Sequence, residues 1–372
     1  MRRAIQPRDR YHYIPIHCAV LGKDQMSANP SPSLPPPDTA TVTDVARLAG
    51  VSISTVSRIL NGNSRVASDK RQAVEAAIQK LQFHPNLSAR SLRSGSTKTV
   101  GVLTQELESL YFTAGAQGVE EGLTGSGFAP LVVPGHWNPK EELDRARLLM
   151  ARKVDAMIIL GGSLSDDQII EIARHLPTAI TGRQLTAPNV FAFGFDQAAG
   201  GAMATRHLIE LGHRRIAHIS GPSTHADAIE RKEGFLNAHR EAQLSVDPRL
   251  IVEGDYQEEG GRRAAHQLLD AGLQFSAVFC ANDQMLWGAR LAFYERGLAV
   301  PDDVSLVGFD DLAQCRYMTP PVTTVRQPMH EVGQAAAYSV LQALGVAQSP
   351  ERPRAELKLS LIVRGTTCKA VS

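Results

Sequence analysis

The chain has 372 residues, which is enough for two or three domains with hydrophobic cores of their own. Its formal net charge of +1 excludes a uniformly basic protein, but the charge is unevenly distributed. Residues 40–98 carry nine Lys and Arg against three Asp and Glu, and the first 39 carry five against three, so the remainder is acidic. A small basic head on an acidic body is typical of a protein whose head meets nucleic-acid phosphates.

The N-terminal residues 1–39 show no hydrophobic periodicity, and the Pro- and Ser-rich stretch 27–38 predicts a disordered tail. Met26 lies just before that stretch and is an alternative start of translation. A mature N-terminal peptide that begins upstream of Met26, detected by mass spectrometry, would contradict this hypothesis.

Residues 41–61 hold two short amphipathic segments separated by a Gly-Val-Ser turn, and a third segment covers about 68–81. Hydroxyl side chains stand at the three expected helix starts: Thr41, Ser52 and Ser68. The apolar faces are predicted to consist of Val45, Ala46, Leu48 and Ala49, then Val56, Ile59 and Leu60, then Val74, Ala77, Ile78 and Leu81. Two helices joined by a tight turn predict a helix-turn-helix, which sets its second helix into the DNA major groove.

A short segment after the third helix has no wide apolar face. Pro85 stops the third helix, Asn86 can cap a further helix of about 87–93, and Gly95 ends it. An isolated helix of that length is unstable in water, so we expect it to order only when something packs against it.

From Thr99 onward, apolar strands alternate with amphipathic helices. The predicted strands are 99–104, 129–134, 154–160, 178–181, 189–196, 215–220, 250–255, 277–282 and 304–310. The predicted helices are 111–125, 140–151, 166–175, 198–211, 228–242, 258–271 and 283–296. This alternation predicts parallel sheets covered on both faces, in two doubly wound units, with ligands bound in the cleft at the carboxyl ends of the strands.

Several long motifs lie in a fixed order. The head reads TVTDVARLAGVSISTVSRILNG (41–62), and the body carries LGHRRIAHISGP (211–222), FCANDQMLWGA (279–289), GLAVPDDVSLVGFDD (297–311) and PPVTTVRQP (320–328). In these motifs and their order, residues 40–366 resemble the lactose/galactose repressor (LacI/GalR) family of bacterial transcription regulators. The resemblance implies a small all-α helix-turn-helix head and a hinge helix, joined to an α/β body of two doubly wound parallel-sheet subdomains of the periplasmic-binding-protein type I.

The resemblance also implies the domain boundaries. After the tail 1–39 come a DNA-binding head at 40–85, a hinge helix and linker at 86–98, and an effector-binding and dimerisation domain at 99–366. Within that domain, the N-subdomain is about 99–195 plus 327–345, and the C-subdomain is about 196–325 plus 353–366.

For the head and hinge, the resemblance assigns DNA-binding roles to ten residues: Thr41, Ile53, Ser54, Thr55, Ser57, Arg58, Asn61, Arg90, Leu92 and Arg93. The chemistry agrees, since Arg58 can pair with a guanine edge and Ile53 can touch a thymine methyl. Leu92 stands where a hinge leucine opens a base step in the minor groove. The alternatives are that Thr55 and Ser57 only cap or solvate a helix, and that Leu92 packs on the body.

For the body, the resemblance gives effector-binding roles to Arg231, Tyr256 and Asp310. Position adds Asn282 at a strand end, Tyr111 and Phe112 at the start of a helix that faces the cleft, and Asp227 one helical turn before Arg231. Carboxylates, an amide, an arginine and an aromatic plate suit a polyhydroxylated ring, so we expect a sugar or sugar derivative, with a purine as the alternative. Asp310 could instead cap or pair structurally, and Arg231 could be a domain-closing ion pair; Asn282 and Tyr256 have similar structural alternatives. Gly182 is a departure, because relatives often carry Asp there, which leaves the ligand's identity open.

A homodimer on a near-palindromic operator is expected, because one three-helix unit covers too little DNA. The resemblance places the body-to-body interface at Met285, Trp287 and Met318. An effector would shift the body between two states and so change operator affinity, while the sign of that coupling stays open.

Two other classes of protein fit less well. A periplasmic sugar-binding protein would share the body's fold, but it would need an export signal and would lack residues 41–95. An enzyme is disfavoured because no nucleophile–base pair, phosphate loop or metal-ligand spacing occurs, so we expect no cofactor and no metal. The cysteines are scattered, no CxxC pair occurs, and no apolar run approaches a membrane span, which together favour a cytoplasmic protein: Cys18, Cys280, Cys315 and Cys368.

Overall fold

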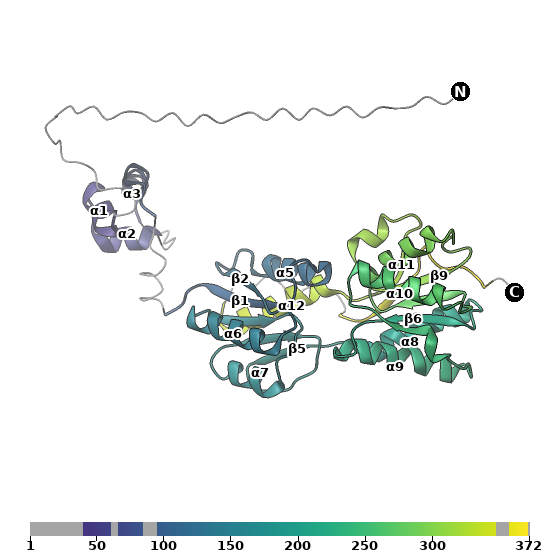
Figure 1. Cartoon of the computed structure of the whole chain (residues 1–372). Helices are drawn as coiled ribbons and strands as arrows, with labels where there is room; N and C mark the ends of the chain where they lie inside the picture. Colours follow the sequence, from purple (N-terminus) through teal and green to yellow (C-terminus); the bar gives the residue numbers. More distant parts are fainter. Residues whose placement is uncertain (1–39, 61–65, 85–94, 347–356, 371–372) are drawn as a thin grey trace, which may run out of the picture. The chain divides into compact units, whose positions relative to one another are not determined.

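In the computed structural model, which describes residues 40–60, 66–84, 95–346 and 357–370, the chain divides into two units at the boundary between residues 86 and 87 (Figure 1). The head contains α1 (Val42–Leu48), α2 (Ile53–Leu60) and α3 (Ser68–Leu81). The three helices share one small core, made of Val45, Ala46, Val56, Ile59, Val74, Ala77 and Phe83.

Side-chain caps fix where the first two helices begin. The Thr41 hydroxyl accepts from the Asp44 amide at 3.3 Å, and the Asp44 carboxylate accepts from the Thr41 amide at 3.0 Å, which is a capping box. The Ser52 hydroxyl accepts from the Thr55 amide at 3.3 Å. Both predicted caps are confirmed.

Two details of the head differ from the sequence prediction. Leu48 is 43% exposed, because it lies about 100° around the helix from the centre of the face formed by Val45, Ala46 and Ala49. Ser68 is the first helical residue and not the cap; the extended backbone that precedes α3 belongs to Ala67, which has no side-chain acceptor.

The first subdomain of the body is built on a five-stranded, all-parallel sheet. Its strands are β1 (Thr99–Thr104), β2 (Ala129–Pro134), β3 (Ala156–Ile159), β4 (Thr178–Thr181) and β5 (Val190–Phe193), in the order β2-β1-β3-β4-β5. One face is covered by α5 (Leu110–Leu123) and α12 (Met329–Ala343), and the other by α6 (Pro139–Ala151) and α7 (Asp166–Ala173). Figure 1 draws α12 in the same lobe as β1 and β2, although more than 190 residues of sequence separate it from each of them.

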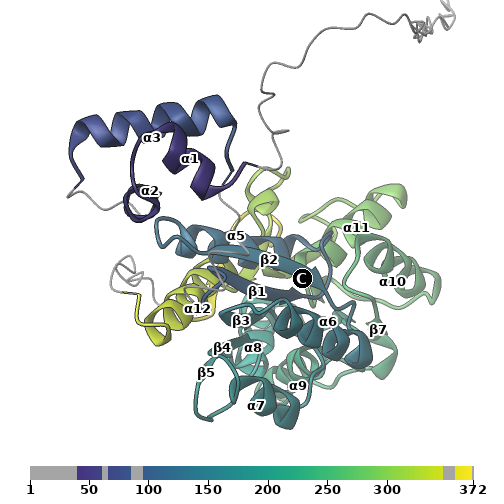
Figure 2. The same ribbon diagram turned by 90° about the vertical axis from the view of Figure 1, so that its left-hand side faces the viewer.

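The second subdomain is built on a six-stranded sheet in the order β11-β10-β9-β8-β6-β7. Its strands are β6 (Ile216–Ser220), β7 (Ile251–Glu253), β8 (Ala277–Cys280), β9 (Ser305–Asp310), β10 (Thr323–Arg326) and β11 (Ser360–Ile362). The helices α8 (Gln197–Glu210) and α9 (Ala226–Glu241) cover one face, and α10 (Glu258–Asp270) and α11 (Asp283–Glu295) cover the other (Figure 2). Two short 3-10 helices, η1 (Pro248–Leu250) and η2 (Ala313–Arg316), complete it.

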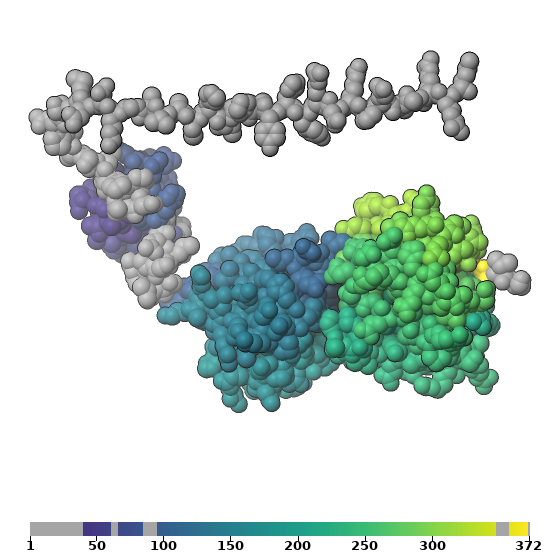
Figure 3. Space-filling model, viewed as in Figure 1, coloured from purple at the N-terminus to yellow at the C-terminus, as the bar shows by residue number. Residues whose placement is uncertain are grey.

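Both subdomains are doubly wound, as predicted, and the predicted elements between residues 99 and 310 are all present with ends displaced by a few residues. One strand departs from the parallel prediction: β11 pairs with β10 in antiparallel fashion, because the chain returns from α12 to the outer edge of the sheet. The chain crosses between the subdomains after β5, before α12 and again before β11. In the space-filling view the two lobes of the body meet along a seam (Figure 3). Within the described segments, no helix is both long and apolar enough to cross a membrane.

Candidate functional site

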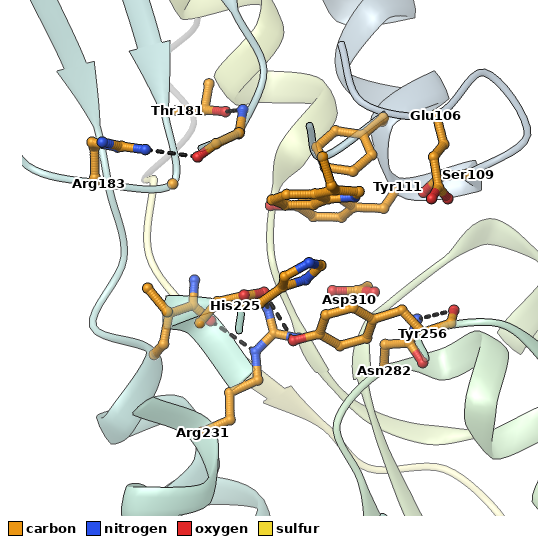
Figure 4. A pocket seen from close by; sticks show the side chains of 18 of the residues that line it. Glu106, Ser109, Tyr111, Thr181, Arg183, His225, Arg231, Tyr256, Asn282 and Asp310 are labelled. Atoms are coloured by element: carbon orange, nitrogen blue, oxygen red, sulfur yellow. Dashed lines mark hydrogen bonds and ion pairs between the residues drawn. The ribbon is translucent and has the colours of Figure 1, made fainter. Parts of the chain in front are cut away.

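A cavity of about 380 Å³ lies between the two subdomains of the body. Residues at or just beyond the carboxyl ends of β1, β3, β4, β7, β8 and β9 contribute to its wall, as expected for a doubly wound fold. The structure brings all seven predicted effector residues together there: Tyr111, Phe112, Asp227, Arg231, Tyr256, Asn282 and Asp310 (Figure 4). Among the described residues, no cluster of His, Cys, Asp and Glu is arranged to hold a metal ion.

Arg231 is the buried cation of this cavity. It is only 3% exposed, its Nε donates to Gln197 Oε1 at 2.9 Å, and its Nη1 donates to the Ala281 carbonyl at 2.6 Å. Its Nη2 lies 3.4 Å from Asp227, one helical turn earlier on α9, and its guanidinium carbon lies 4.0 Å from the centre of the Phe309 ring. These contacts fix the plane of the guanidinium, so its remaining N–H groups have a set direction.

Two carboxylates flank Arg231. Asp310 ends β9 with a left-handed backbone (φ 116°), and its Oδ1 accepts from Gln327 Nε2 at 2.8 Å. Burial raises the pKa of Asp310, and the positive charge of Arg231 opposes that rise. Asp227 accepts from the Tyr256 hydroxyl at 3.0 Å, and burial raises the pKa of that hydroxyl. Tyr256 is therefore a neutral donor to a carboxylate.

Asn282 holds the pocket wall together. Its Oδ1 accepts from the Met285 amide at 2.9 Å and so caps α11, while its Nδ2 donates to the Tyr256 carbonyl at 2.8 Å. The second bond fixes the loop that carries Tyr256, whose own backbone is left-handed (φ 66°). The structural alternative for Asn282 therefore has direct support in these two bonds.

Several lining residues were not predicted from the sequence as parts of the site: Glu106, Ser109, Trp137, Gln197, His225 and Gln257. Trp137 of the first subdomain stacks on His225 of the second, with ring centroids 4.1 Å apart. Gln257 Nε2 donates to Glu106 Oε2 at 2.9 Å, also across the cleft. Most of these residues follow strand ends or begin helices outside the motifs quoted above, and no periodicity marks them. Arg183, beside the departure at Gly182, donates to the Gly162 carbonyl at 2.7 Å and holds a loop of the wall.

The outer face of α2 is the second candidate site. Ile53 is 48% exposed, Ser54 and Arg58 are exposed, and Thr55 and Ser57 are half-buried. The Ser52 hydroxyl lies 2.8 Å from that of Ser54 and 2.9 Å from that of Thr55, so these hydroxyls form one cluster at the helix start. The Thr41 hydroxyl donates to Asp44 at 2.7 Å. The other predicted DNA contacts lie outside the described residues: Asn61, Arg90, Leu92 and Arg93.

The three residues predicted to form the dimer interface differ in how deeply they are buried. Met285 is fully buried in the core of the second subdomain, beneath α10, so its side chain cannot reach a partner subunit and this prediction is wrong. Met285 does lie on α11, but its side chain points into the core of the subdomain. Trp287 and Met318 are partly buried against the same core, and their role at an interface stays a prediction.

Comparisons with known proteins cover both parts of the chain. A model of the bacterial regulatory proteins of the lacI family matches residues 41–86, and a model of the periplasmic binding protein-like domain matches residues 205–367. The transcriptional regulator GalR of Escherichia coli K12 is 34% identical over 319 residues, which cover 86% of this chain and 92% of GalR. The transcriptional repressor PurR of Escherichia coli O1:K1 is 37% identical over 309 residues, which cover 82% of this chain and 90% of PurR.

Solved structures of transcriptional regulators also match most of the chain. The crystal structure of the lac repressor dimer bound to operator and the anti-inducer ONPF superposes with a TM-score of 0.75 at 28% identity, covering 88% of this chain and 99% of that one. The complex of the transcriptional regulator CelR with cellobiose superposes with a TM-score of 0.62 at 32% identity, over 88% and 99% of the two chains.

Proposed function

Because the chain belongs to the lacI family of bacterial regulatory proteins, and so is a DNA-binding transcriptional regulator, we propose that it is a repressor controlled by a small uncharged effector. The effector occupies the cavity between the subdomains and changes how tightly the head holds operator DNA. The proposed effector is a sugar or sugar derivative.

One observation carries this proposal: Arg231 pairs with Asp227 at 3.4 Å and is close enough to Asp310 for their charges to interact, in a cavity that the Tyr256 ring also lines. Sugar hydroxyls donate to carboxylates and accept from a guanidinium, and the C–H face of a sugar ring packs on an aromatic ring. The ion pair with Asp227 leaves Arg231 without unpaired positive charge, which disfavours anionic ligands.

A purine is the second candidate, and two observations favour it. Four aromatic side chains of the wall, Tyr111, Phe112, Trp137 and Tyr256, offer flat surfaces on which a base could stack. PurR is also among the relatives, at 37% identity. The sugar is preferred because a neutral base does not need two carboxylates beside the arginine.

For the whole chain, we propose the division into a DNA-binding head at 40–85, a hinge at 86–98 and an effector-binding, dimerising body at 99–366. Two heads of a homodimer would read a near-palindromic operator, with Arg58 and its neighbours on α2 at the base edges. The protein would act in the cytoplasm, where that DNA is. We assign the cavity a binding role without catalysis, and turnover of a bound ligand would contradict that.

The test is a thermal-shift screen with D-galactose, D-glucose, cellobiose, adenine, guanine and hypoxanthine. A ligand at about 100 times its Kd should stabilise the protein by about 2.7 kcal/mol. Each ligand that does so is then added to a binding assay with an operator selected from random duplexes. A sugar that stabilises the protein and changes operator affinity would support the proposal, and a response to purines alone would replace it.

A matched pair of variants ties the response to the cavity. Asp310→Asn should abolish stabilisation by the active ligand, because the substitution replaces one acceptor oxygen by an NH2 group that only donates. The exposed Asp302→Asn makes the same chemical change away from the cavity and should leave the response intact.

A further inference from the structure

Two aromatic rings from opposite subdomains close the cavity directly on each other. Trp137, in the loop between β2 and α6, stacks on His225, at the start of α9, with centroids 4.1 Å apart and ring planes 26° from parallel. We propose that Trp137 and His225 form an aromatic clasp across the cleft that selects effectors by size, which makes both of them specificity-determining residues. This inference rests on the proposed effector-binding function of the cavity.

The clasp belongs to a longer column of rings. On the second subdomain, the Tyr256 ring lies 5.8 Å from that of His225, also in a stacked arrangement. On the first, the Phe112 ring meets Trp137 edge to face at 5.7 Å. Each partner of the clasp is thus supported from behind by a ring of its own subdomain, and the contact between Trp137 and His225 is the junction.

The backbone that presents Trp137 is strained and held in place. His136 and Trp137 both have left-handed conformations, with φ values of 56° and 54°. Consecutive left-handed residues other than glycine are uncommon, and such strain concentrates at functional sites. Gln105, which is fully buried, accepts from the Trp137 amide with its Oε1 at 2.9 Å. The loop is therefore built to hold the indole in the cavity.

Among the described residues, no side-chain hydrogen bond explains the position of His225. It occupies the N-cap position of α9, yet its side chain makes no capping hydrogen bond. Its Nδ1 is buried without a hydrogen-bond partner among those residues. Burial lowers the pKa of His225, against the opposing charges of Asp227 and Glu106, so a neutral imidazole faces the indole.

The spacing of the clasp determines what it admits. Two rings 4.1 Å apart are already in van der Waals contact, so no third ring can enter between them. In the view of Figure 4, His225 lies between the end of the cavity with Thr181 and Arg183 and the end with Asp310 and Tyr256. We therefore expect a one-ring ligand to bind at the Asp310 end with the clasp intact, and a two-ring ligand that extends toward Arg183 to bind only when the clasp opens.

The clasp can be removed without opening every contact between the subdomains. The hydrogen bond from Gln257 to Glu106 also crosses the cleft and involves neither ring. A His225→Ala variant therefore keeps one of the bridging contacts, and a change in its ligand preference reports the missing ring.

The first test needs no ligand and uses the tryptophan emission of the full-length protein. The chain has two tryptophans, so His225→Ala is compared in the wild-type and in the Trp137→Phe backgrounds. Loss of the imidazole uncovers the Trp137 indole, so the emission should move to longer wavelength in the wild-type background and stay unchanged with Trp137→Phe. No shift, or the same shift in both backgrounds, would overturn the proposal.

The second test measures selectivity, as the ratio of the Kd values for D-glucose and cellobiose. His225→Ala should shift the ratio toward cellobiose by about two- to tenfold, which corresponds to the worth of one aromatic pair. His225→Phe keeps a ring at this position and should keep the wild-type ratio, and so should His175→Ala in the exposed turn after α7. An unchanged ratio in His225→Ala would contradict the clasp. If neither sugar binds the wild type, the sugar proposal fails, while the fluorescence test still decides whether the clasp exists.

Discussion

His218 is a buried histidine outside the effector site. Its ring lies between those of Phe235 and Phe279, at centroid distances of 5.0 and 4.7 Å, and its Nδ1 lies 2.9 Å from the Phe279 carbonyl. Complete burial lowers the pKa of His218 to about 4, from an ordinary value of 6.5. The imidazole is therefore neutral in the folded protein at every pH at which the protein would normally be handled.

The depressed pKa predicts a loss of stability in acid. Between pH 6.5 and about 4, the unfolded chain binds a proton at His218 that the folded chain does not, so stability falls as the pH falls through this window. From pH 7.5 to 5 this residue should account for a loss of about 2 kcal/mol. Urea unfolding of His218→Phe and wild type at both pH values should show that difference, and His175→Phe, an exposed control, should not. Parallel pH profiles of His218→Phe and wild type would contradict the prediction.

Arg58 is the exposed arginine of α2. Arg58→Ala should reduce discrimination between a selected operator and random DNA by about 1–3 kcal/mol, because the bidentate pair with a guanine edge is lost. Competition binding at one fixed salt concentration measures this, since salt alone changes affinity. Lys80→Ala, on the exposed side of α3, removes a positive charge from the same head and should leave the specificity ratio in place. Unchanged specificity in Arg58→Ala would show that Arg58 does not contact the operator bases.

At the scale of single residues, positions at strand ends were predictable and positions in irregular loops were not. Asp310 ends a continuous apolar strand, and the doubly wound topology brings such ends to one edge. Trp137 and His225 meet only because two loops of different subdomains fold toward each other. Met285 shows a further limit, because a motif fixes the helix on which a residue stands, while the side chain's direction depends on the packing of α10 against it.

At the scale of elements, glycines set how closely the helices of each layer pack. A Cβ on Gly118 of α5 would lie 1.9 Å from the His330 carbonyl oxygen of α12. A Cβ on Gly333 of α12 would lie 2.1 Å from the Gly115 carbonyl oxygen of α5. The two helix pairs of the second subdomain repeat this reciprocal arrangement: Gly201 with Gly234 between α8 and α9, and Gly261 with Gly288 between α10 and α11. Backbone therefore touches backbone in each pair.

This packing predicts that one added methyl group is costly. Gly118→Ala should lower the free energy of unfolding by about 1–3 kcal/mol or more, because the obstacle is a helix backbone that cannot move aside. Gly101→Ala on β1 is the matched control, since its Cβ would meet only the Leu149 side chain, at 3.0 Å or beyond, and should cost less. Chemical unfolding of both variants measures the difference, and equal losses would show that the contact between α5 and α12 is not limiting.

The same packing explains which elements the sequence did not reveal. Alternation of apolar strands and amphipathic helices predicted the body as far as Asp310, because each such element buries a recognisable face. The periodicity does not show that α12 returns to cover the first sheet, or that β11 runs antiparallel at the edge of the second. Those placements depend on contacts between segments far apart in the chain.

At the scale of the whole body, a line of hydrogen bonds joins the cavity to two segments where the chain crosses between subdomains. Arg231 donates to Gln197, at the crossing after β5; Gln197 Nε2 donates to Gln327 Oε1 at 2.9 Å; and Gln327, at the crossing before α12, donates to Asp310. Both glutamines are buried. The two groups proposed to grip the effector thus share hydrogen bonds with the residues about which the subdomains would rotate.

Breaking this line should weaken the response to an effector more than it weakens the binding of the effector. Gln327→Met is similar in size and cannot donate to Asp310 or accept from Gln197, so Asp310 can shift without moving the crossing. The coupling factor, which is the ratio of the operator Kd values with and without a saturating effector, should fall by about 2- to 30-fold, a change of 0.5–2 kcal/mol. Linkage requires the operator to change effector affinity by that same reduced factor, so both measurements must agree. Gln342→Met, on the exposed side of α12, is the control, and circular dichroism checks that each variant is folded. A Gln327→Met protein that binds effector normally and keeps the full coupling factor would show that the crossings respond to the effector by another route.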